Sequence, residues 1–153
     1  MLDGFTILAG YVSSETGGGG IMIQGASPLI EGCRFVHNLA GFAHGGAILV
    51  ANGSPTIRSC EFTQNYAHLG DGAGIEISGA SAPLIEGCRF SGNIAVGSDP
   101  TGDGAAISNH SSLPVVIRSC VFEDNVARNF YSAGDVDLAW GGAIFNMADG
   151  MIV

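Results

Sequence analysis

One short pattern occurs four times in this chain of 153 residues. Each copy has an isoleucine, a cysteine three residues later, a phenylalanine after two more, an asparagine after three more and an alanine after another two. The copies are PLIEGCRFVHNLA (28–40), PTIRSCEFTQNYA (55–67), PLIEGCRFSGNIA (83–95) and VVIRSCVFEDNVA (115–127). A period of this length is typical of a solenoid, in which each repeat buries its apolar face only against its neighbours.

A second, glycine-rich pattern accompanies the first. Its copies are GGGGIMI (17–23), GGAILV (45–50), GAGIEI (72–77), GAAISN (104–109) and GGAIFN (141–146). Alternating isoleucines followed by Gly, Ser and Asn indicate short strands and turns, and no segment has a helical period. We therefore expect an all-β parallel β-helix of about five coils, with three short strands per coil and equivalent residues stacked in ladders.

The repeat also divides the chain. We expect a single β-helix domain over 1–153, with a partial coil at 1–16, coils at 17–44, 45–71, 72–103 and 104–140, and a partial coil at 141–153. Because the pattern starts and stops within a repeat, we expect a fragment of a longer solenoid. The rest of the parent chain would then be a partner at both ends, and the open strand edges would favour self-association.

Charge and hydropathy exclude some classes of function. The net charge is −9 and the chain has no lysine, which argues against nucleic acid because phosphate contacts need Lys and Arg. No apolar run approaches the roughly 18 residues that a transmembrane helix needs, so we expect no transmembrane segment in this piece. No signal peptide is visible in it either.

Charged residues test the stacking. Residues Glu31, Arg58, Glu86 and Arg118 follow the isoleucines of successive copies, and residues Arg34, Glu61, Arg89 and Val121 follow the cysteines. The signs alternate in both series, as expected if opposite charges lie above one another in parallel coils. We interpret four of the five arginines as structural, and the alternative is an arginine-lined anion site.

The paired motifs Gly-Gly-Ala-Ile and Phe-x-x-Asn resemble the repeats of bacterial polymorphic outer-membrane proteins. They occur here at 45–48 and 141–144, and at Phe35/Asn38, Phe62/Asn65, Phe90/Asn93 and Phe122/Asn125. More broadly, the chain is similar to the right-handed parallel β-helices of the pectate-lyase-like superfamily. The resemblance implies right-handed coils, a secreted or bacterial cell-surface or outer-membrane location, and adhesion.

The cysteines depart from that superfamily, which often has an asparagine ladder at the bend after the second strand. At this bend the chain has Cys33, Cys60, Cys88 and Cys120, which removes side-chain amide hydrogen bonds there. Their spacing fits no zinc site, and stacking would hold the sulfur atoms apart. We expect four buried free thiols that act as small apolar groups; a bonded or reactive role is the alternative.

The expected binding edge lies beside the glycine-rich strands, where loops of increasing length leave the stack. Residues predicted to line this face are Met22, Leu49, Ser108, Phe145, Phe130, Tyr131 and Trp140. An apolar stripe there is either covered by other parts of the protein or available to a glycan or protein. We expect contact with a polysaccharide or with a host or cell surface.

Catalysis and metal binding have weaker candidates. Glu76, Asp103 and His110 form the potential acid–base cluster, and the resemblance suggests a polysaccharide lyase or glycoside hydrolase as the alternative function. The lyase base and the hydrolase motifs of that superfamily are missing, so we expect a non-catalytic scaffold or adhesin-type segment. We expect no cofactor; the alternative is Ca²⁺ held by Asp99, Asp103, Asp135 and Asp137.

Overall fold

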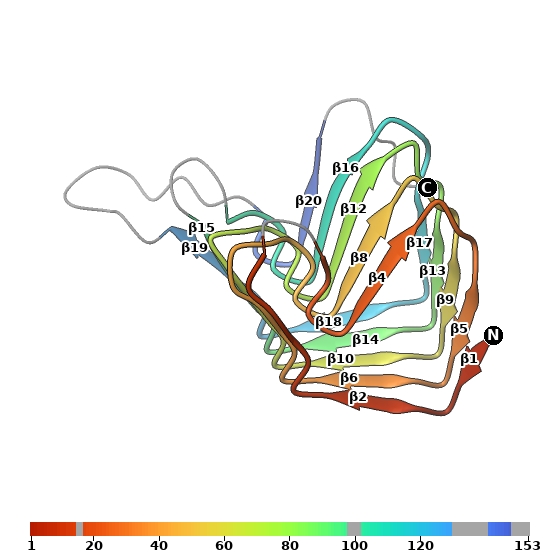
Figure 1. Cartoon of the computed structure of the whole chain (residues 1–153), viewed down its shortest axis with the longest axis horizontal. Coiled ribbons are helices and arrows are strands. Elements are labelled where there is room, and N and C mark those ends of the chain that lie inside the picture. Colours follow the sequence, from red (N-terminus) through yellow and green to blue (C-terminus); the bar gives the residue numbers. More distant parts are fainter. Residues whose placement is uncertain (15–16, 98–101, 130–140, 148–153) are drawn as a thin grey trace.

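The computed structural model describes residues 1–14, 17–97, 102–129 and 141–147. Over these residues the chain forms a parallel β-solenoid, in which four sheets of five strands run along a common axis (Figure 1). Every strand pairs in parallel with the equivalent strand of the next coil. The predicted all-β parallel solenoid is therefore confirmed. No helix in the described part of the chain is long and apolar enough to cross a membrane.

The four sheets are named A to D in the order in which each coil visits them. Sheet A contains β1 (Leu2–Asp3), β5 (Leu29–Glu31), β9 (Thr56–Arg58), β13 (Leu84–Glu86) and β17 (Val116–Arg118). Sheet B contains β2 (Thr6–Leu8), β6 (Arg34–Val36), β10 (Glu61–Thr63), β14 (Arg89–Ser91) and β18 (Val121–Glu123). Sheet C contains β3 (Tyr11–Val12), β7 (Leu39–Ala40), β11 (Tyr66–His68), β15 (Ile94–Gly97) and β19 (Val126–Asn129). Sheet D contains β4 (Ile21–Gln24), β8 (Ile48–Ala51), β12 (Ile75–Gly79), β16 (Ile107–Ser111) and β20 (Ile144–Asn146).

A complete coil has four strands, so the expected three per coil was wrong. The additional strand is that of sheet C, which the sequence pattern assigned to the end of the repeat motif. Its strands are two to four residues long, too short to show a clear alternation. Its inward residue is alanine, as at Ala67 and Ala95, and a small inward side chain gives a weak apolar signal.

Single residues in the left-handed conformation turn the chain between sheets. Gly32 (φ 58°) and Ser59 (φ 52°) occupy the bend between sheets A and B in successive coils. His37 (φ 53°) and Gln64 (φ 52°) do the same between sheets B and C. Each is followed by the Cys or the Asn of the repeat motif, so both residues mark the bends of the coil.

The Gly-Gly-Ala-Ile motif forms the approach to sheet D. Gly45 has a φ of 72°, which disfavours residues with a side chain. A Cβ atom on Gly46 would lie 2.4 Å from the carbonyl oxygen of Ala73 in the next coil. Glycine is therefore required because the backbones of adjacent coils touch here.

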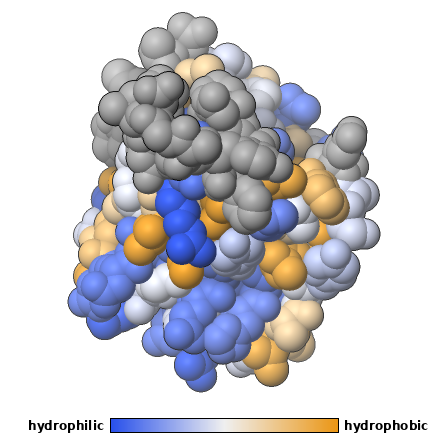
Figure 2. All heavy atoms as spheres, turned by 90° about the vertical axis from the view of Figure 1, so that its left-hand side faces the viewer, coloured by the Kyte–Doolittle hydropathy of each residue, from blue (hydrophilic) through white to orange (hydrophobic). Residues whose placement is uncertain are grey.

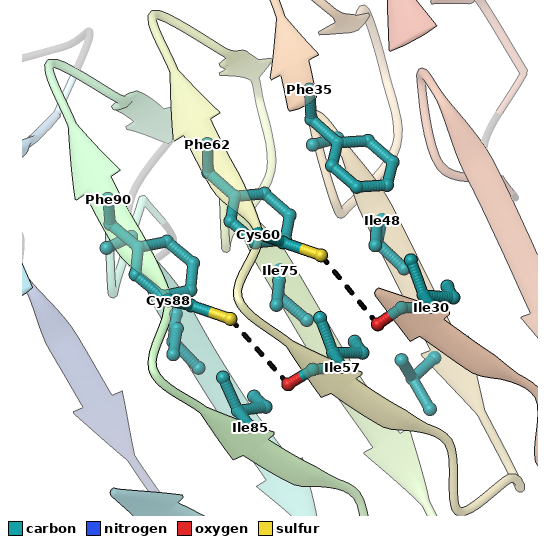
Figure 3. Packing of buried hydrophobic residues seen from close by; sticks show 14 of the residues in the cluster. Ile30, Phe35, Ile48, Ile57, Cys60, Phe62, Ile75, Ile85, Cys88 and Phe90 are labelled. Carbon is teal, nitrogen blue, oxygen red and sulfur yellow. Dashed lines mark hydrogen bonds between the residues drawn. The ribbon is translucent and has the colours of Figure 1, made fainter. Parts of the chain in front are cut away.

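The core consists of ladders of identical side chains. Phe35, Phe62 and Phe90 are fully buried and stack with ring centroids 4.9 and 4.6 Å apart (Figure 3). The thiols form the predicted column, since Cys60 Sγ and Cys88 Sγ each donate a hydrogen bond to a carbonyl of the preceding coil. All four cysteines are free, and three are buried. The remaining one, Cys120, is half-buried, which corrects the expectation of four buried thiols.

Asparagine forms a ladder one bend further along each coil. Asn65 Oδ1 accepts hydrogen bonds from both the backbone amide and the side-chain amide of Asn38, at 3.0 and 2.9 Å. Asn93 and Asn125 repeat this arrangement in the following coils. Side-chain amides are thus absent from the cysteine bend but present in the fold, at the bend between sheets B and C.

Ion pairs between coils confirm the structural interpretation of four arginines. In sheet A, Arg58 pairs with Glu31 at 2.8 Å and Arg118 pairs with Glu86 at 2.9 Å. In sheet B, Arg34 pairs with Glu61 at 2.9 Å and Arg89 pairs with Glu123. Arg89 therefore bonds Glu123 of the next coil rather than Glu61 below it. The side chains are largely exposed, so the pairs fix register more than they add stability.

Candidate functional site

The site that the sequence predicted lies on the outer face of sheet D. The pairing register stacks the outward residues of five successive strands in one ladder: Met22, Leu49, Glu76, Ser108 and Phe145. Met22 is 43% exposed, whereas Leu49, Glu76 and Ser108 are buried although they point away from the core. Their burial indicates that another part of each coil covers this face.

The covering part is the segment that returns from sheet C to sheet D. Sheet C extends away from the main body, and the chain folds back to the base of sheet D (Figure 1). Small side chains permit this close return, because Ala67, Ala73, Ala95 and Ala105 pack as a separate cluster. The returning segment and sheet D therefore meet in a concave corner that runs along the solenoid.

A hollow of about 440 Å³ occupies this corner, and we refer to it as the sheet D cleft. Its lining combines apolar side chains with acidic, imidazole and small polar groups. The lining residues are Met22, Gln24, His44, Leu49, Ala51, Asp71, Glu76, Ser78 and His110. No arginine is among them, so the positive charge that the cleft can offer comes from histidine.

Asp71 is the most strongly bonded acid of the cleft. Its Oδ1 accepts hydrogen bonds from the backbone amides of Gly102 and Asp103, at 2.7 and 2.9 Å. Its Oδ2 lies 3.6 Å from both His44 Nδ1 and His110 Nε2. Burial acts to raise the pKa of Asp71, but the hydrogen bonds from His110 and the two amides outweigh it and hold the pKa below its usual value. Asp71 is therefore ionised at neutral pH.

Glu76 has the opposite electrostatic environment. Burial, and then the nearby charge of Asp71, raise the pKa of Glu76 well above its usual value. Its Oε1 lies 3.9 Å from His110 Nε2, whereas its buried Oε2 has no hydrogen-bond partner among the described residues. The cleft thus holds two carboxyl groups whose pKa values are shifted in opposite directions, a combination that acid–base enzymes use.

The imidazole of His110 links Asp71 and Glu76 to residues of its own coil and of the next coil. Its Nε2 lies 2.9 Å from Ser108 Oγ, and its Nδ1 lies 3.4 Å from Met147 Sδ. Its ring is tilted 47° against that of Phe145, with centroids 5.4 Å apart. The imidazole therefore contacts an acid on one side and apolar groups on the other.

The predicted cluster of Glu76, Asp103 and His110 comes together around Asp71. The backbone of Asp103 bonds Asp71, and the side chain of Asp103 is buried. Asp71 and His44 were not among the residues predicted for the acid–base cluster. A signal was present, because His44, Asp71 and Asp103 each directly precede the glycine that begins the approach to sheet D. This shared repeat position stacks polar side chains in the corner.

The remaining predicted residues cannot be placed. Phe130, Tyr131, Trp140, Asp99, Asp135 and Asp137 lie outside the residues that the structure describes. Within the described ranges, no group of three or more His, Cys, Asp or Glu side chains could hold a metal ion. Calcium binding by Asp103 with the other loop aspartates remains a prediction.

The stacked coils, their ladders and the lateral cleft define the class of this protein as a parallel β-solenoid. Residues 5–145 match the family described as right handed beta helix region, so the chain belongs to the right-handed β-helix family. The coils are right-handed, as the resemblance implied. No curated protein and no solved structure matches the chain. The narrower resemblance to polymorphic outer-membrane proteins remains a prediction.

Proposed function

We propose that this chain is a non-catalytic β-helical segment of a secreted or surface protein, and that it binds glycan in the sheet D cleft. The observation that carries the proposal is the buried Glu76 Oε2, which has no hydrogen-bond partner among the described residues. Burying a polar atom without a partner is costly, and a ligand hydroxyl would supply the missing bond. Met22 and Leu49 line the same hollow and offer an apolar surface to the ring of a sugar.

Charge selects the class of glycan. The cleft contains ionised Asp71, and its lining includes neither Lys nor Arg, in a chain with a net charge of −9. A polyanionic glycan would be repelled by this surface. A neutral Glu76 can both donate and accept a hydrogen bond, as a sugar hydroxyl does. The ligand that fits best is therefore a neutral oligosaccharide.

A lyase is the less suitable enzymatic class. The resemblance to the pectate-lyase-like superfamily implies that a lyase would use Arg or Lys for proton abstraction, and the chain has no lysine. Arg34, Arg58, Arg89 and Arg118 are all engaged in ion pairs on sheets A and B, away from the cleft. These observations support a binding role over elimination chemistry.

A glycoside hydrolase is the second candidate, because one observation favours it. The pKa of Glu76 is raised and the pKa of Asp71 is lowered within the same cleft. A neutral carboxyl group can protonate a leaving oxygen while an ionised one activates water, which is the division of labour in glycoside hydrolysis. Release of reducing ends separates this candidate from simple binding.

The test uses the whole chain with neutral oligosaccharides, measured by isothermal titration calorimetry and by release of reducing ends. We expect binding without product, weakened in Met22→Ala and in Glu76→Ala and unchanged in the control Thr63→Ala on sheet B. Absence of binding across cello-, xylo-, malto- and chito-oligosaccharides would contradict the proposal. Reducing ends that form with the wild type and disappear in Glu76→Gln would instead support the hydrolase.

A further inference from the structure

A second hollow, of about 630 Å³, lies on the outer face of sheet C, away from the sheet D cleft. The residues that matter for its chemistry are Tyr11, Leu39, Phe42, Gln64, Tyr66 and His68. We refer to it as the sheet C groove. It lies on the side of the molecule seen in Figure 2, where apolar residues are exposed among polar ones.

The exposed apolar surface has a structural origin. In sheet C the inward position is taken by Val12 in the first strand and by alanine in the other four, while the outward ladder contains Tyr11, Leu39, Tyr66, Ile94 and Val126. Tyr11 is 64% exposed, Phe42 is 57% exposed and Val126 is 45% exposed. Outward positions on a sheet with one solvated face are normally polar. A contiguous apolar ladder there marks a surface that binds something.

The rings along the groove have two orientations. Tyr66 and His68 are nearly parallel, with an interplanar angle of 17° and centroids 6.2 Å apart. Phe42 is at 74° to His68, at the same centroid distance. The imidazole of His68 is positioned by the backbone, because its Nδ1 lies 3.2 Å from the carbonyl oxygen of Gly41. The aromatic surface is therefore built from rings whose placement is shared between two coils.

The polar groups of the groove carry no fixed charge. Its lining contains Gln64, His37 and two tyrosines but no Asp, Glu, Lys or Arg, although the chain as a whole has a net charge of −9. A charged ligand would find no counter-charge in this groove. The complementary ligand is uncharged, has apolar ring faces and has hydroxyl groups at its edges.

The ladder also sets a distance. Tyr11 pairs with Leu39, and Leu39 pairs with Tyr66, so the two tyrosines occupy the same position two coils apart. Strands in a sheet lie about 4.8 Å apart, which separates the two positions by roughly 9.6 Å along the solenoid axis. A chain that lies along this axis can therefore contact both tyrosines at once, through sugar rings that are not neighbours.

We propose that the sheet C groove is a second glycan site, in which Tyr11 and Tyr66 stack on separate rings of one neutral, extended polysaccharide chain. Phe42 and His68 bound the sugar laterally, and Gln64 bonds its hydroxyl groups. The site is separate from the sheet D cleft, and the two proposals can fail independently.

The test measures binding of cellohexaose and xylohexaose by isothermal titration calorimetry, with hexagalacturonate as the charged comparison. Tyr11→Ala and Tyr66→Ala should each weaken the groove's affinity for a neutral hexasaccharide by about tenfold or more, as truncation of a buried aromatic anchor does. Tyr66→Phe keeps the ring and should retain affinity. Val126→Ala, in the same ladder but outside the groove, is the matched control and should have no effect.

Met22→Ala, in the sheet D cleft, separates the two sites. If both sites bind, Met22→Ala should remove only the contribution of the cleft. Hexasaccharide binding that persists in Met22→Ala and is lost when Tyr11→Ala is added supports the groove, whether or not the cleft binds. Equal loss in Val126→Ala, tighter binding of hexagalacturonate, or no neutral hexasaccharide binding that depends on the tyrosines would overturn the proposal. A concentration-dependent dimer abolished by Tyr11→Ala would also overturn it, because a second copy would then occupy the groove. If Tyr66→Ala fails to fold by circular dichroism, the exposed Tyr11 variant decides.

Discussion

Asn65→Ala should be among the most destabilising single changes in this chain, although it removes a polar residue. Asn65 is 1% exposed, and its carboxamide takes part in four hydrogen bonds. Oδ1 accepts from the backbone and side-chain amides of Asn38, and Nδ2 donates to the Phe35 carbonyl and to Asn93 Oδ1. The variant therefore disturbs three consecutive coils.

The expected magnitude follows from what each partner retains. The side-chain amide of Asn38 still donates to the carbonyl of Ile7, and Asn93 Oδ1 still accepts from the Asn65 backbone. The buried Asn38 backbone amide loses its acceptor, which costs about 1–3 kcal/mol, and the other lost bonds cost about 1 kcal/mol each. We expect the free energy of unfolding to fall by about 4–6 kcal/mol, a large part of the stability of most domains.

The assay is urea unfolding followed by circular dichroism, with the control Thr63→Ala on the outer face of the same coil. Asn65→Asp keeps the volume and the acceptor but loses both donated bonds, so it should also be strongly destabilising. A loss of about 1 kcal/mol or less in Asn65→Ala would refute the reasoning, because the ladder would then contribute little beyond packing.

Three further predictions concern charge and thiol chemistry. Arg58→Glu places a third carboxylate between Glu31 and Glu86, so its Tm at low salt should be below that of the wild type and recover in about 1 M NaCl; equal values at low salt would argue against this register effect. The raised pKa of Glu76 means that the folded chain holds a proton that the unfolded chain releases. Unfolding free energy should therefore fall as pH rises above 4.5 toward the raised pKa, and Glu76→Gln should lack that fall in urea titrations. Iodoacetamide should modify Cys120 first, because it is the only half-buried thiol of the four and the neighbouring Cys88 lowers its pKa; uniform labelling in peptide mass mapping would contradict this.

The ladders of the fold were predictable because they depend on residues that repeat. The isoleucine, cysteine and phenylalanine positions recur with the same internal spacing, and each predicted stack is present in the pairing register. The alternating charges were informative for the same reason, since stacked carboxylates and guanidinium groups must neutralise one another. Only the partner of Arg89 differed, because Glu61 is already paired with Arg34 and Glu123 lies opposite Ser91, two residues along the same strand as Arg89.

Sheet C, together with the segment that returns from it to sheet D, could not be predicted in the same way. Its strands are short, its inward residues after Val12 are alanines, and its outward ladder mixes Tyr11, Leu39 and Tyr66. The burial of Glu76 depends on how closely the returning segment approaches sheet D, which is a property of backbone geometry. The sequence therefore identified Glu76 and His110 as candidates but gave no indication that Glu76 would be buried or that Asp71 would be its charged neighbour.

The contrast between ladders also indicates where function can reside in such a solenoid. The inward ladders of sheets A and B repeat one residue type over several coils, as Ile57 and Ile85 or Phe62 and Phe90 do, because each coil must fill the same space and a change of volume would be felt by both neighbours. The outward ladder of sheet D instead contains Met22, Leu49, Glu76, Ser108 and Phe145, a different residue in every coil. Packing does not require this variety of outward residues. The variety produces a surface whose chemistry changes along the solenoid axis. A linear ligand would meet an apolar floor in the first coils and an acid–imidazole cluster in the next, so its orientation along the solenoid would be fixed.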